Sequence, residues 1–416
     1  MNSDYIKKVF GYWQVRILIS AWITYAAFYL VRVNMSVAIP GIIAEYGMSK
    51  TEIGIVLTAL FTTYAIGQFI NGQLGDKVDS RYYVTLGLAI SAIINLIFGF
   101  FSNGIMFAMI LLWGLNGIFQ SMGWAPTVKT INNWYHPHKR GKASGILGTS
   151  YIFGNAVSWA FAGLIVGLAG WRWAFIIPGI VCLFIAVHWF ILGRSSPEKV
   201  NLPPIEEEGD DGEKASLAYT LKKTLTNKYV WIIGFGLFFL NIVRYGFMDW
   251  AVTYMFEIQK ATISTAAYKA ILFPIAGILG ALSAGFISDK FLKTKRAPVA
   301  AVMLVLLSIA VWLYPKAPLH NWVMSLALLM AVGFFTFGPH VLMVTAMPMD
   351  FGKKKVTSSI TGFIDGMGYI GAAITGVLTG WLVDNYNWQA AFDFWLIGAI
   401  LSAVMMFILW AMLRKK

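Results

Sequence analysis

Residues 72–77 read Gly-Gln-Leu-Gly-Asp-Lys, and residues 285–290 read Gly-Phe-Ile-Ser-Asp-Lys. The two stretches share Gly, Asp and Lys at the same positions and lie 213 residues apart in a chain of 416. Each follows an apolar run of about 20 residues, long enough to cross a hydrocarbon core of about 30 Å. The pair therefore predicts a membrane protein built from two copies of one helical unit.

Similar apolar runs recur along the whole chain, which is 58% hydrophobic and only 12% charged. A soluble chain of this length carries roughly twice that charged fraction. We predict an all-α membrane protein with twelve transmembrane helices, arranged as two pseudo-symmetric six-helix bundles. The predicted spans are 17–40, 54–75, 83–101, 105–128, 143–168, 173–192, 229–256, 267–289, 297–315, 320–346, 356–383 and 389–412.

Other landmarks repeat at nearly the same offset. Arg32 recurs as Arg244, and Trp171 followed by Phe175 recurs as Trp388 followed by Phe392. The apolar pattern breaks once, in a stretch with three prolines and a run of acidic residues, a composition typical of a flexible linker. The predicted domains are an N-terminal bundle (1–193), a cytoplasmic linker (194–228) and a C-terminal bundle (229–416).

The net charge of +13 follows the predicted topology. Of the 32 Lys and Arg residues, 25 lie at the termini and in the even-numbered loops, and five lie in the odd-numbered loops. This asymmetry is what the positive-inside rule produces, so both termini and the linker are expected in the cytoplasm. We therefore expect a multi-pass protein of the cell (inner) membrane that binds the lipid bilayer and no nucleic acid.

Several kinds of chemistry lack their sequence signatures. The single cysteine, Cys182, cannot form an intrachain disulfide, and the five histidines show no metal-ligand spacing. No Ser-His-Asp set, Walker loop or dinucleotide fingerprint occurs. We expect no enzymatic activity, no cofactor and no metal, and a monomeric protein.

Arg32 and Arg244 each lie about 15 residues into an apolar span, at a depth of some 22 Å. Estimates for burying a lone guanidinium at the bilayer centre run from about 2.5 to more than 10 kcal/mol. A bound phosphate offsets this cost, because the planar fork of arginine donates two parallel hydrogen bonds to it. The alternative is pairing with a buried carboxylate. Asp249 and Asp365 are available to Arg244, whereas no N-terminal span contains a carboxylate.

The loops at 72–77 and 285–290 resemble the signature loop of the major facilitator superfamily. Three narrower strings resemble its organophosphate:phosphate antiporter family, which includes glycerol-3-phosphate and hexose-phosphate exchangers. They are Tyr25-x-x-x-Tyr29-Leu-Val-Arg32-Val-Asn34 in span 1, Gln120-Ser-Met-Gly123-Trp124-Ala-Pro126 in span 4, and Arg244-Tyr245-Gly246-x-x-Asp249-Trp250 in span 7. The resemblance covers essentially the whole chain.

The resemblance implies exchange of a phosphorylated metabolite for inorganic phosphate, with both arginines on the phosphate and the two tyrosines lining the site. A lysine found in span 2 of several members is Gln68 here, and a histidine in span 5 of the glycerol-3-phosphate carriers aligns with Tyr151. These changes weaken the case for glycerol 3-phosphate. The expected substrate-binding residues are Arg32, Arg244, Tyr25, Tyr29, Gln68, Gln120, Trp124, Tyr151, Asn241 and Asp365.

We expect transport by alternating access, in which the two bundles rock around the bound phosphate. Four charged residues at cytoplasmic helix ends are expected to form ion pairs that close this side: Asp76, Arg81, Arg140 and Asp289. Two other functions stay open. One is a proton-coupled organic-anion symporter that uses the buried Asp365. The other is a membrane sugar-phosphate sensor of the same fold, because sensor relatives keep the same arginines.

Overall fold

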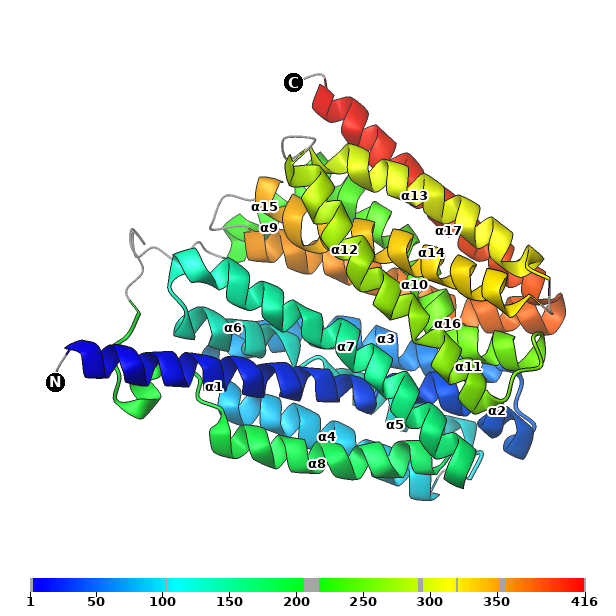
Figure 1. Cartoon of the computed structure of the whole chain (residues 1–416), viewed down its shortest axis with the longest axis horizontal. Coiled ribbons are helices and arrows are strands. Elements are labelled where there is room, and N and C mark those ends of the chain that lie inside the picture. Colours follow the sequence, from blue (N-terminus) through cyan, green and yellow to red (C-terminus); the bar gives the residue numbers. More distant parts are fainter. Residues whose placement is uncertain are drawn as a thin grey trace. The chain divides into compact units, whose positions relative to one another are not determined.

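The computed structural model describes residues 3–101, 103–205, 217–290, 295–318, 321–351 and 357–414. Within these ranges the chain forms helices and no strands (Figure 1). The N-terminal half contains α1 (Ser3–Leu30), α2 (Asn34–Tyr46), α3 (Lys50–Lys77), α4 (Ser80–Phe101), α5 (Met106–Gln120), α6 (Trp124–Trp134), α7 (Pro137–Ala169), α8 (Trp173–Leu192) and the short 3-10 helix η1 (Pro197–Val200).

The C-terminal half has the same kind of elements. It contains α9 (Leu217–Leu225), α10 (Lys228–Glu257), α11 (Ile263–Ala270), α12 (Leu272–Lys290), α13 (Arg296–Leu313), the 3-10 helix η2 (Tyr314–Lys316), α14 (Trp322–Val341), the π-helix η3 (Leu342–Ala346), α15 (Met347–Phe351), α16 (Thr357–Asn385) and α17 (Trp388–Arg414).

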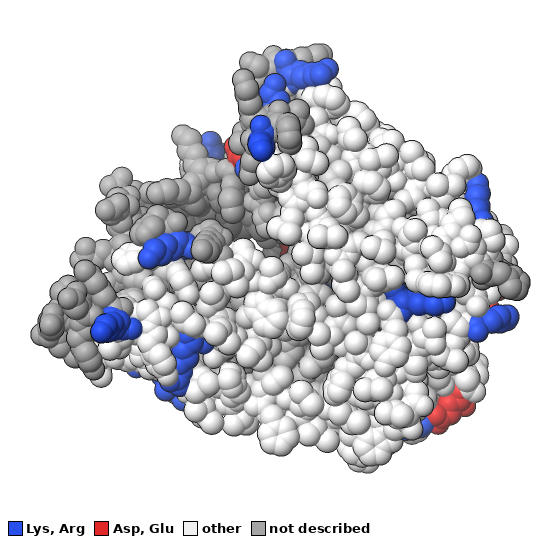
Figure 2. Space-filling view, viewed as in Figure 1, with Lys and Arg blue, Asp and Glu red and all other residues white. Residues whose placement is uncertain are grey.

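Each predicted span coincides with helix, so the predicted all-α membrane fold is confirmed. Eleven stretches of the described chain are long and apolar enough to cross a membrane, and the 28-residue α3 covers the remaining predicted span. Large apolar side chains such as Phe184 and Leu282 are exposed, as expected for lipid-facing helices. Charged side chains are sparse on the face drawn in Figure 2.

The spans are less regular than the sequence indicated, because four of them are broken or distorted. The first is split between α1 and α2, the fourth between α5 and α6, and the eighth between α11 and α12. The tenth continues from α14 into the π-helix η3. The predicted linker contains two short helices, η1 and α9, and its residues 206–216 lie outside the described ranges.

By their contacts the residues group into two compact units. Unit 1 comprises residues 1–35 and 63–213, and unit 2 comprises residues 36–62 and 214–416. In unit 1, α1 packs on α7 and α8, and α4 packs on α5 and α8 (Figure 1). In unit 2, α10 packs on α16 and α17, and α14 packs on α12 and α13. Residues 36–62, which cover most of α2 and the first half of α3, belong to the first repeat in sequence but group with the second repeat by their contacts.

The break at the end of α1 places Arg32 in a tight turn. The Arg32 amide donates to the Tyr29 carbonyl at 3.3 Å and the Val33 amide donates to the same oxygen at 3.0 Å. An α-helix leaves its last carbonyls without intrahelical partners, and in an apolar interior each such group needs a donor. The buried end of α1 therefore requires polar side chains from its neighbours.

Four side chains supply these donors. Asn95 of α4 and Asn116 of α5 each donate to the Val31 carbonyl at 2.9 Å. Gln120 donates to the Phe28 carbonyl at 3.0 Å, and the Cys182 thiol lies 3.2 Å from the Ala27 carbonyl. These contacts hold the broken end of α1 against α4, α5 and α8.

Asn34 ties the start of α2 to the same neighbours. Its Nδ2 donates to Asn95 Oδ1 and to the Ala174 carbonyl, both at 2.9 Å. Asn95 therefore links both sides of the break, and the backbone around Arg32 is fixed by buried hydrogen bonds.

We predict that Asn95→Ala destabilises unit 1 by about 1–3 kcal/mol, because it removes a donor from a buried carbonyl and an acceptor from Asn34. The buried Cys182 is the only cysteine, so a thiol-reactive fluorophore reports unfolding in detergent directly. The matched control is Asn103→Ala at an exposed position. Equal unfolding temperatures for the two variants would contradict this account of the break.

Candidate functional site

Arg32 is buried against aromatic rings of unit 1. The residue is 7% exposed, and its guanidinium carbon lies 4.6 Å from the ring centre of Tyr64 and 5.5 Å from that of Tyr29. A cation over an aromatic face gains about 0.5–2 kcal/mol, more when water is excluded. The N–H donors of the guanidinium lie in the plane of the group.

The structure brings together most of the residues predicted around Arg32. Tyr25 and Tyr29 are buried, with ring centres 6.0 Å apart. The Tyr25 ring lies 4.7 Å from that of Trp124, and the Tyr29 ring lies 6.5 Å from that of Tyr151. One aromatic cluster thus joins α1, α6 and α7 on the side of unit 1 that holds Arg32, the residue predicted to bind phosphate.

The two predicted glutamines have different environments. Gln120 is buried and its amide donates to the backbone of α1, so it supports the position of Arg32 through the helix break. Gln68 is half-buried on α3, four residues after Tyr64 and therefore on the same helix face.

Arg244 lies on α10 in unit 2 and is 5% exposed. Its Nη1 is 3.0 Å from Nε2 of His340 on α14. Its guanidinium carbon lies 5.0 Å from the ring centre of Tyr245 and 5.2 Å from that of Phe337. Like Arg32, it is a buried cation against aromatic rings, and it has a hydrogen-bonded imidazole in addition.

Two other predicted residues lie on α10 and α16 of the same unit. Asn241 is one turn before Arg244, and a side chain added at Gly368 would collide with its amide nitrogen. Asn241 Oδ1 is buried and has no hydrogen-bond partner within the described ranges. Asp365 is half-buried on α16, three residues before Gly368. Asn241 therefore faces α16 close to the level of Asp365.

The sequence interpretation missed Tyr64, Phe337 and His340, whose rings contact the two arginines. It also missed Asn95 and Asn116, which hold the break beside Arg32. The buried asparagines carried a usable signal, since an amide inside an apolar span needs a specific partner. The three rings carried none, because aromatic side chains fill the interiors of membrane proteins generally.

The predicted gating residues are only partly described. The side chains of Asp76 and Asp289 lie outside what the structure describes. Arg81 donates from Nε to the Phe190 carbonyl of α8, and Arg140 donates to the carbonyls of Asn132 and Tyr135 at the end of α6. Both arginines therefore bind helix ends inside unit 1.

The start of α3 forms a network with α10, α16 and α17 that we call the Asp384 latch (Lys50, Thr51, Glu257, Asp384 and Trp388). The Asp384 carboxylate accepts from the amides of Lys50 and Thr51, at 3.2 and 2.7 Å, and from the Thr51 hydroxyl at 2.7 Å. The Lys50 ammonium lies 3.1 Å from Glu257, which also accepts from the Trp388 indole at 2.9 Å. A carboxylate on the first amides of a helix complements its positive end.

Beyond the latch, α3 is also held against α16 by the Thr58 hydroxyl and by close packing of the two backbones. The Thr58 hydroxyl donates to the Ala373 carbonyl at 2.6 Å and accepts from the Val377 amide at 3.1 Å. A side chain at Gly54 would collide with the Gly376 carbonyl, so the α3 and α16 backbones approach closely there. Ser49 and Glu52 form a capping box that fixes the start of α3.

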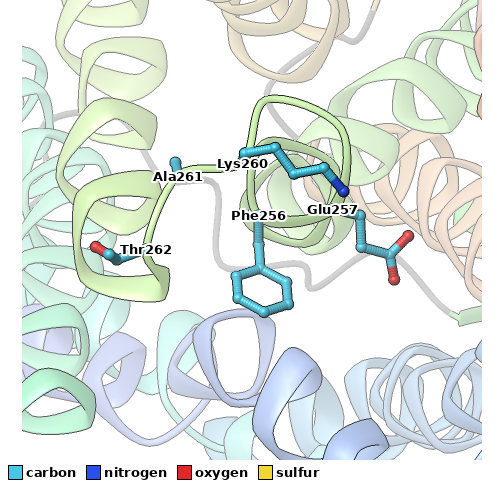
Figure 3. Close-up of a pocket in the computed structure, with 5 residues that line it drawn as sticks. All are labelled: Phe256, Glu257, Lys260, Ala261 and Thr262. Carbon is cyan, nitrogen blue, oxygen red and sulfur yellow. The ribbon is translucent and has the colours of Figure 1, made fainter.

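Two open pockets flank the latch, and neither is lined by Arg244. One, of about 440 Å³, is lined in part by Lys50, Glu257 and Trp388. The other, of about 470 Å³, lies at the turn after α10, where Figure 3 shows the Lys260 side chain extending toward Glu257. Its lining residues are Phe256, Glu257, Lys260, Ala261 and Thr262.

Comparisons with known proteins identify the family. A family model for the Major Facilitator Superfamily matches residues 21–376. The chain is 31% identical to a probable hexose phosphate transport protein of Chlamydia trachomatis, over 98% of this chain and 93% of that protein. It is 32% identical to a glycerol-3-phosphate transporter of Bacillus subtilis, over 95% and 92%. It is 29% identical to the membrane sensor protein UhpC of Escherichia coli, over 98% and 94%.

The chain belongs to the major facilitator superfamily and, within it, to the organophosphate:phosphate antiporter family. It is therefore a multi-pass membrane protein of a transporter family rather than an enzyme. Solved structures confirm the fold. A bacterial homologue of the human lysosomal transporter Spinster matches with a TM-score of 0.77 at 17% identity, over 95% of each chain. The nucleoside transporter NupG matches with a TM-score of 0.70 at 16% identity, over 96% of this chain and 99% of that one.

We predict that Asp384→Asn loosens the latch, because a neutral amide no longer complements the start of α3. Phe61 of α3 is buried with its ring centre 4.5 Å from that of Tyr245 on α10, so a cysteine there reports separation of these helices. In a Cys182→Ser, Phe61→Cys background, Asp384→Asn should increase the rate of maleimide labelling several-fold. Asp393→Asn, at an exposed position on α17, is the control. An unchanged labelling rate would show that Asp384 does not hold α3 in place.

Proposed function

We propose that this protein is a secondary transporter that exchanges a phosphorylated metabolite for inorganic phosphate by alternating access. One observation supports the proposal most strongly: each repeat holds one buried arginine against aromatic rings, Arg32 at 7% and Arg244 at 5% exposure. In the proposal, both bind the same phosphate group. The hexose phosphate and glycerol-3-phosphate transport proteins among the relatives make a phosphate ester the favoured substrate.

The chemistry of the two arginines suits a phosphate. Arginine keeps its charge at any physiological pH and donates in-plane hydrogen bonds in a fork that matches phosphate oxygens. Uncharged aromatic rings pack against the guanidiniums of Arg32 and Arg244 and restrict their movement. Tyr25, Tyr29 and Tyr151 add hydroxyl donors on the Arg32 side of the proposed site.

Exchange follows from the same charges. Closing an empty site over two cations is unfavourable, because repulsion grows as water leaves. A bound phosphate compensates both charges, so the loaded carrier changes state more readily than the empty one. Inward movement of one phosphate compound is then coupled to outward movement of another.

The Asp384 latch gives alternating access a defined contact to break. It joins residues 36–62 of the first repeat to α10, α16 and α17 of the second. In the proposal, the latch opens on one side of the membrane while the predicted ion pairs of Asp76, Arg81, Arg140 and Asp289 close the other. The charge distribution supports cytoplasmic termini and a cytoplasmic position for those ion pairs.

A sensor function is the second candidate, and the 29% identity to UhpC favours it. A sensor binds a sugar phosphate without net movement of the ligand. Both functions require phosphate binding at Arg32 and Arg244, and only flux distinguishes them. Proton-coupled symport through Asp365 is distinguished by transport that follows an imposed pH gradient and is lost in Asp365→Asn.

We predict obligatory exchange in proteoliposomes. Vesicles loaded with inorganic phosphate should take up labelled glucose 6-phosphate or glycerol 3-phosphate, and vesicles without internal phosphate should take up little. The reason is the unfavourable return of the empty, doubly cationic site. Equal uptake in both kinds of vesicle would contradict exchange, and binding without uptake in either would favour the sensor.

We predict that Arg32→Lys and Arg244→Lys each reduce exchange by about tenfold to a hundredfold, because an ammonium cannot reproduce the planar fork of a guanidinium. The matched control is Arg16→Lys on α1, where Arg16 contacts Tyr12 and Trp13 near the surface. Phosphate exchange measured in proteoliposomes checks both. Near-normal exchange in either variant would remove that arginine from the proposed site.

A further inference from the structure

Arg244 of α10 and His340 of α14 are joined by a buried hydrogen bond. His340 lies near the end of α14, is 7% exposed and has Nε2 at 3.0 Å from Arg244 Nη1. Because a guanidinium only donates hydrogen bonds, Nε2 must be the acceptor and carry a lone pair. The imidazole is therefore neutral in this contact, with its proton on Nδ1.

A neutral acceptor has a different consequence from a carboxylate. A carboxylate would hold Arg244 in place and also cancel its charge. The imidazole accepts from one N–H of the guanidinium and adds no negative charge beside it. His340 therefore orients Arg244 without acting as a counter-charge itself.

The other ring nitrogen supports a functional reason for this histidine. His340 Nδ1 is buried and has no hydrogen-bond partner within the described ranges. An unmade hydrogen bond of a buried polar group is costly, and such groups in native proteins call for a specific explanation.

The backbone of the tenth span is shaped around this contact. Pro339 removes one helical hydrogen bond immediately before His340, and the π-helix Leu342–Ala346 begins two residues after it. Single π-turns inside α-helices occur frequently at functional sites. Phe337, three residues before His340 and on the same face, packs on Arg244 at 5.2 Å. The end of α14 thus supplies both an acceptor and a ring to one guanidinium.

We propose that His340 is a positioning residue for Arg244, acting as an uncharged hydrogen-bond acceptor that orients the guanidinium toward the phosphate group of the substrate and adds no negative charge that would compete with it. The proposal rests on the proposed phosphate exchange, because orientation and charge of Arg244 matter only if it binds an anion. His340 acts through Arg244, so the proposal requires no contact between His340 and the phosphate.

Three substitutions at residue 340 separate orientation from charge. His340→Gln places an amide oxygen close to the position of Nε2, whereas the shorter His340→Asn places its amide close to that of Nδ1. His340→Gln should keep the Michaelis constant for phosphate within about twofold of the original, and His340→Asn should raise it about tenfold, the effect of losing one hydrogen bond to a charged group. His340→Glu should raise it further, because a carboxylate neutralises Arg244.

The measurement is phosphate–phosphate exchange in proteoliposomes, with KM and the maximal rate determined separately for each variant. The control is His188→Gln, at a histidine of α8 in unit 1. A rise in KM for Asn and Glu, with Gln close to the original protein, supports the proposal. Equal KM values for Gln and Asn, or a normal KM for Glu, would overturn it.

The outcome also separates this proposal from the proposed function. If the original protein neither exchanges nor binds labelled phosphate, phosphate exchange fails as the function and His340 loses its proposed role with it. If the original protein exchanges phosphate and all three variants keep its KM, only the role of His340 fails. A thermal unfolding curve for each variant, read at Cys182, identifies loss of fold. If either His340→Asn or His340→Glu does not fold, the KM of the other variant, compared with that of His340→Gln, decides the point.

Discussion

A guanidinium in an apolar interior must keep hydrogen-bond and electrostatic partners, and this requirement shapes both repeats of the chain. Arg32 lies in a break between two helices, and its neighbours are aromatic rings. Arg244 lies in the middle of an unbroken helix, and its neighbours are two rings and an imidazole. The two repeats meet the same requirement by different means. In both, aromatic rings pack against the buried cation.

The break beside Arg32 has its own physical cost, which buried amides offset. Val31 accepts from two asparagines, and Asn34 binds one of them on the other side of the break. In a membrane, a helix interrupted in this way is tolerated only where the freed backbone groups find partners within the protein. These asparagines are therefore part of the architecture that places Arg32, although they are distant in sequence from the motif that contains it.

The sequence predicted the parts of the fold that depend on composition and length. Long apolar runs, the repeated Gly-x-x-x-Asp-Lys loop and the distribution of Lys and Arg indicated an all-α membrane protein with a duplicated unit. Helix spacing and family motifs also singled out Tyr25, Tyr29, Trp124 and Tyr151 as candidate substrate-binding residues. The structure brings these rings together in unit 1.

Features that depend on side-chain packing between helices were not predictable from the pattern. Nothing around His340 in the sequence indicates that its ring reaches Arg244, which is 96 positions away. Residues 36–62 group with the second repeat, where the Asp384 carboxylate accepts from the Thr51 amide at the start of α3. These two residues are also far apart in the sequence. Hydropathy also could not locate the breaks in the first and fourth spans, because each break is only three residues long (31–33 and 121–123) and leaves the span apolar as a whole.

The central claim is that one phosphate group is held by an arginine from each repeat. Calorimetric titration of inorganic phosphate into the purified protein, combined with Arg32→Lys, Arg244→Lys and the double variant, tests it most directly. The account predicts one phosphate per chain, with affinity weakened by either single change and the two losses non-additive, because both side chains act on the same ligand. Two phosphates per chain, each lost with only one of the arginines, would contradict a shared site.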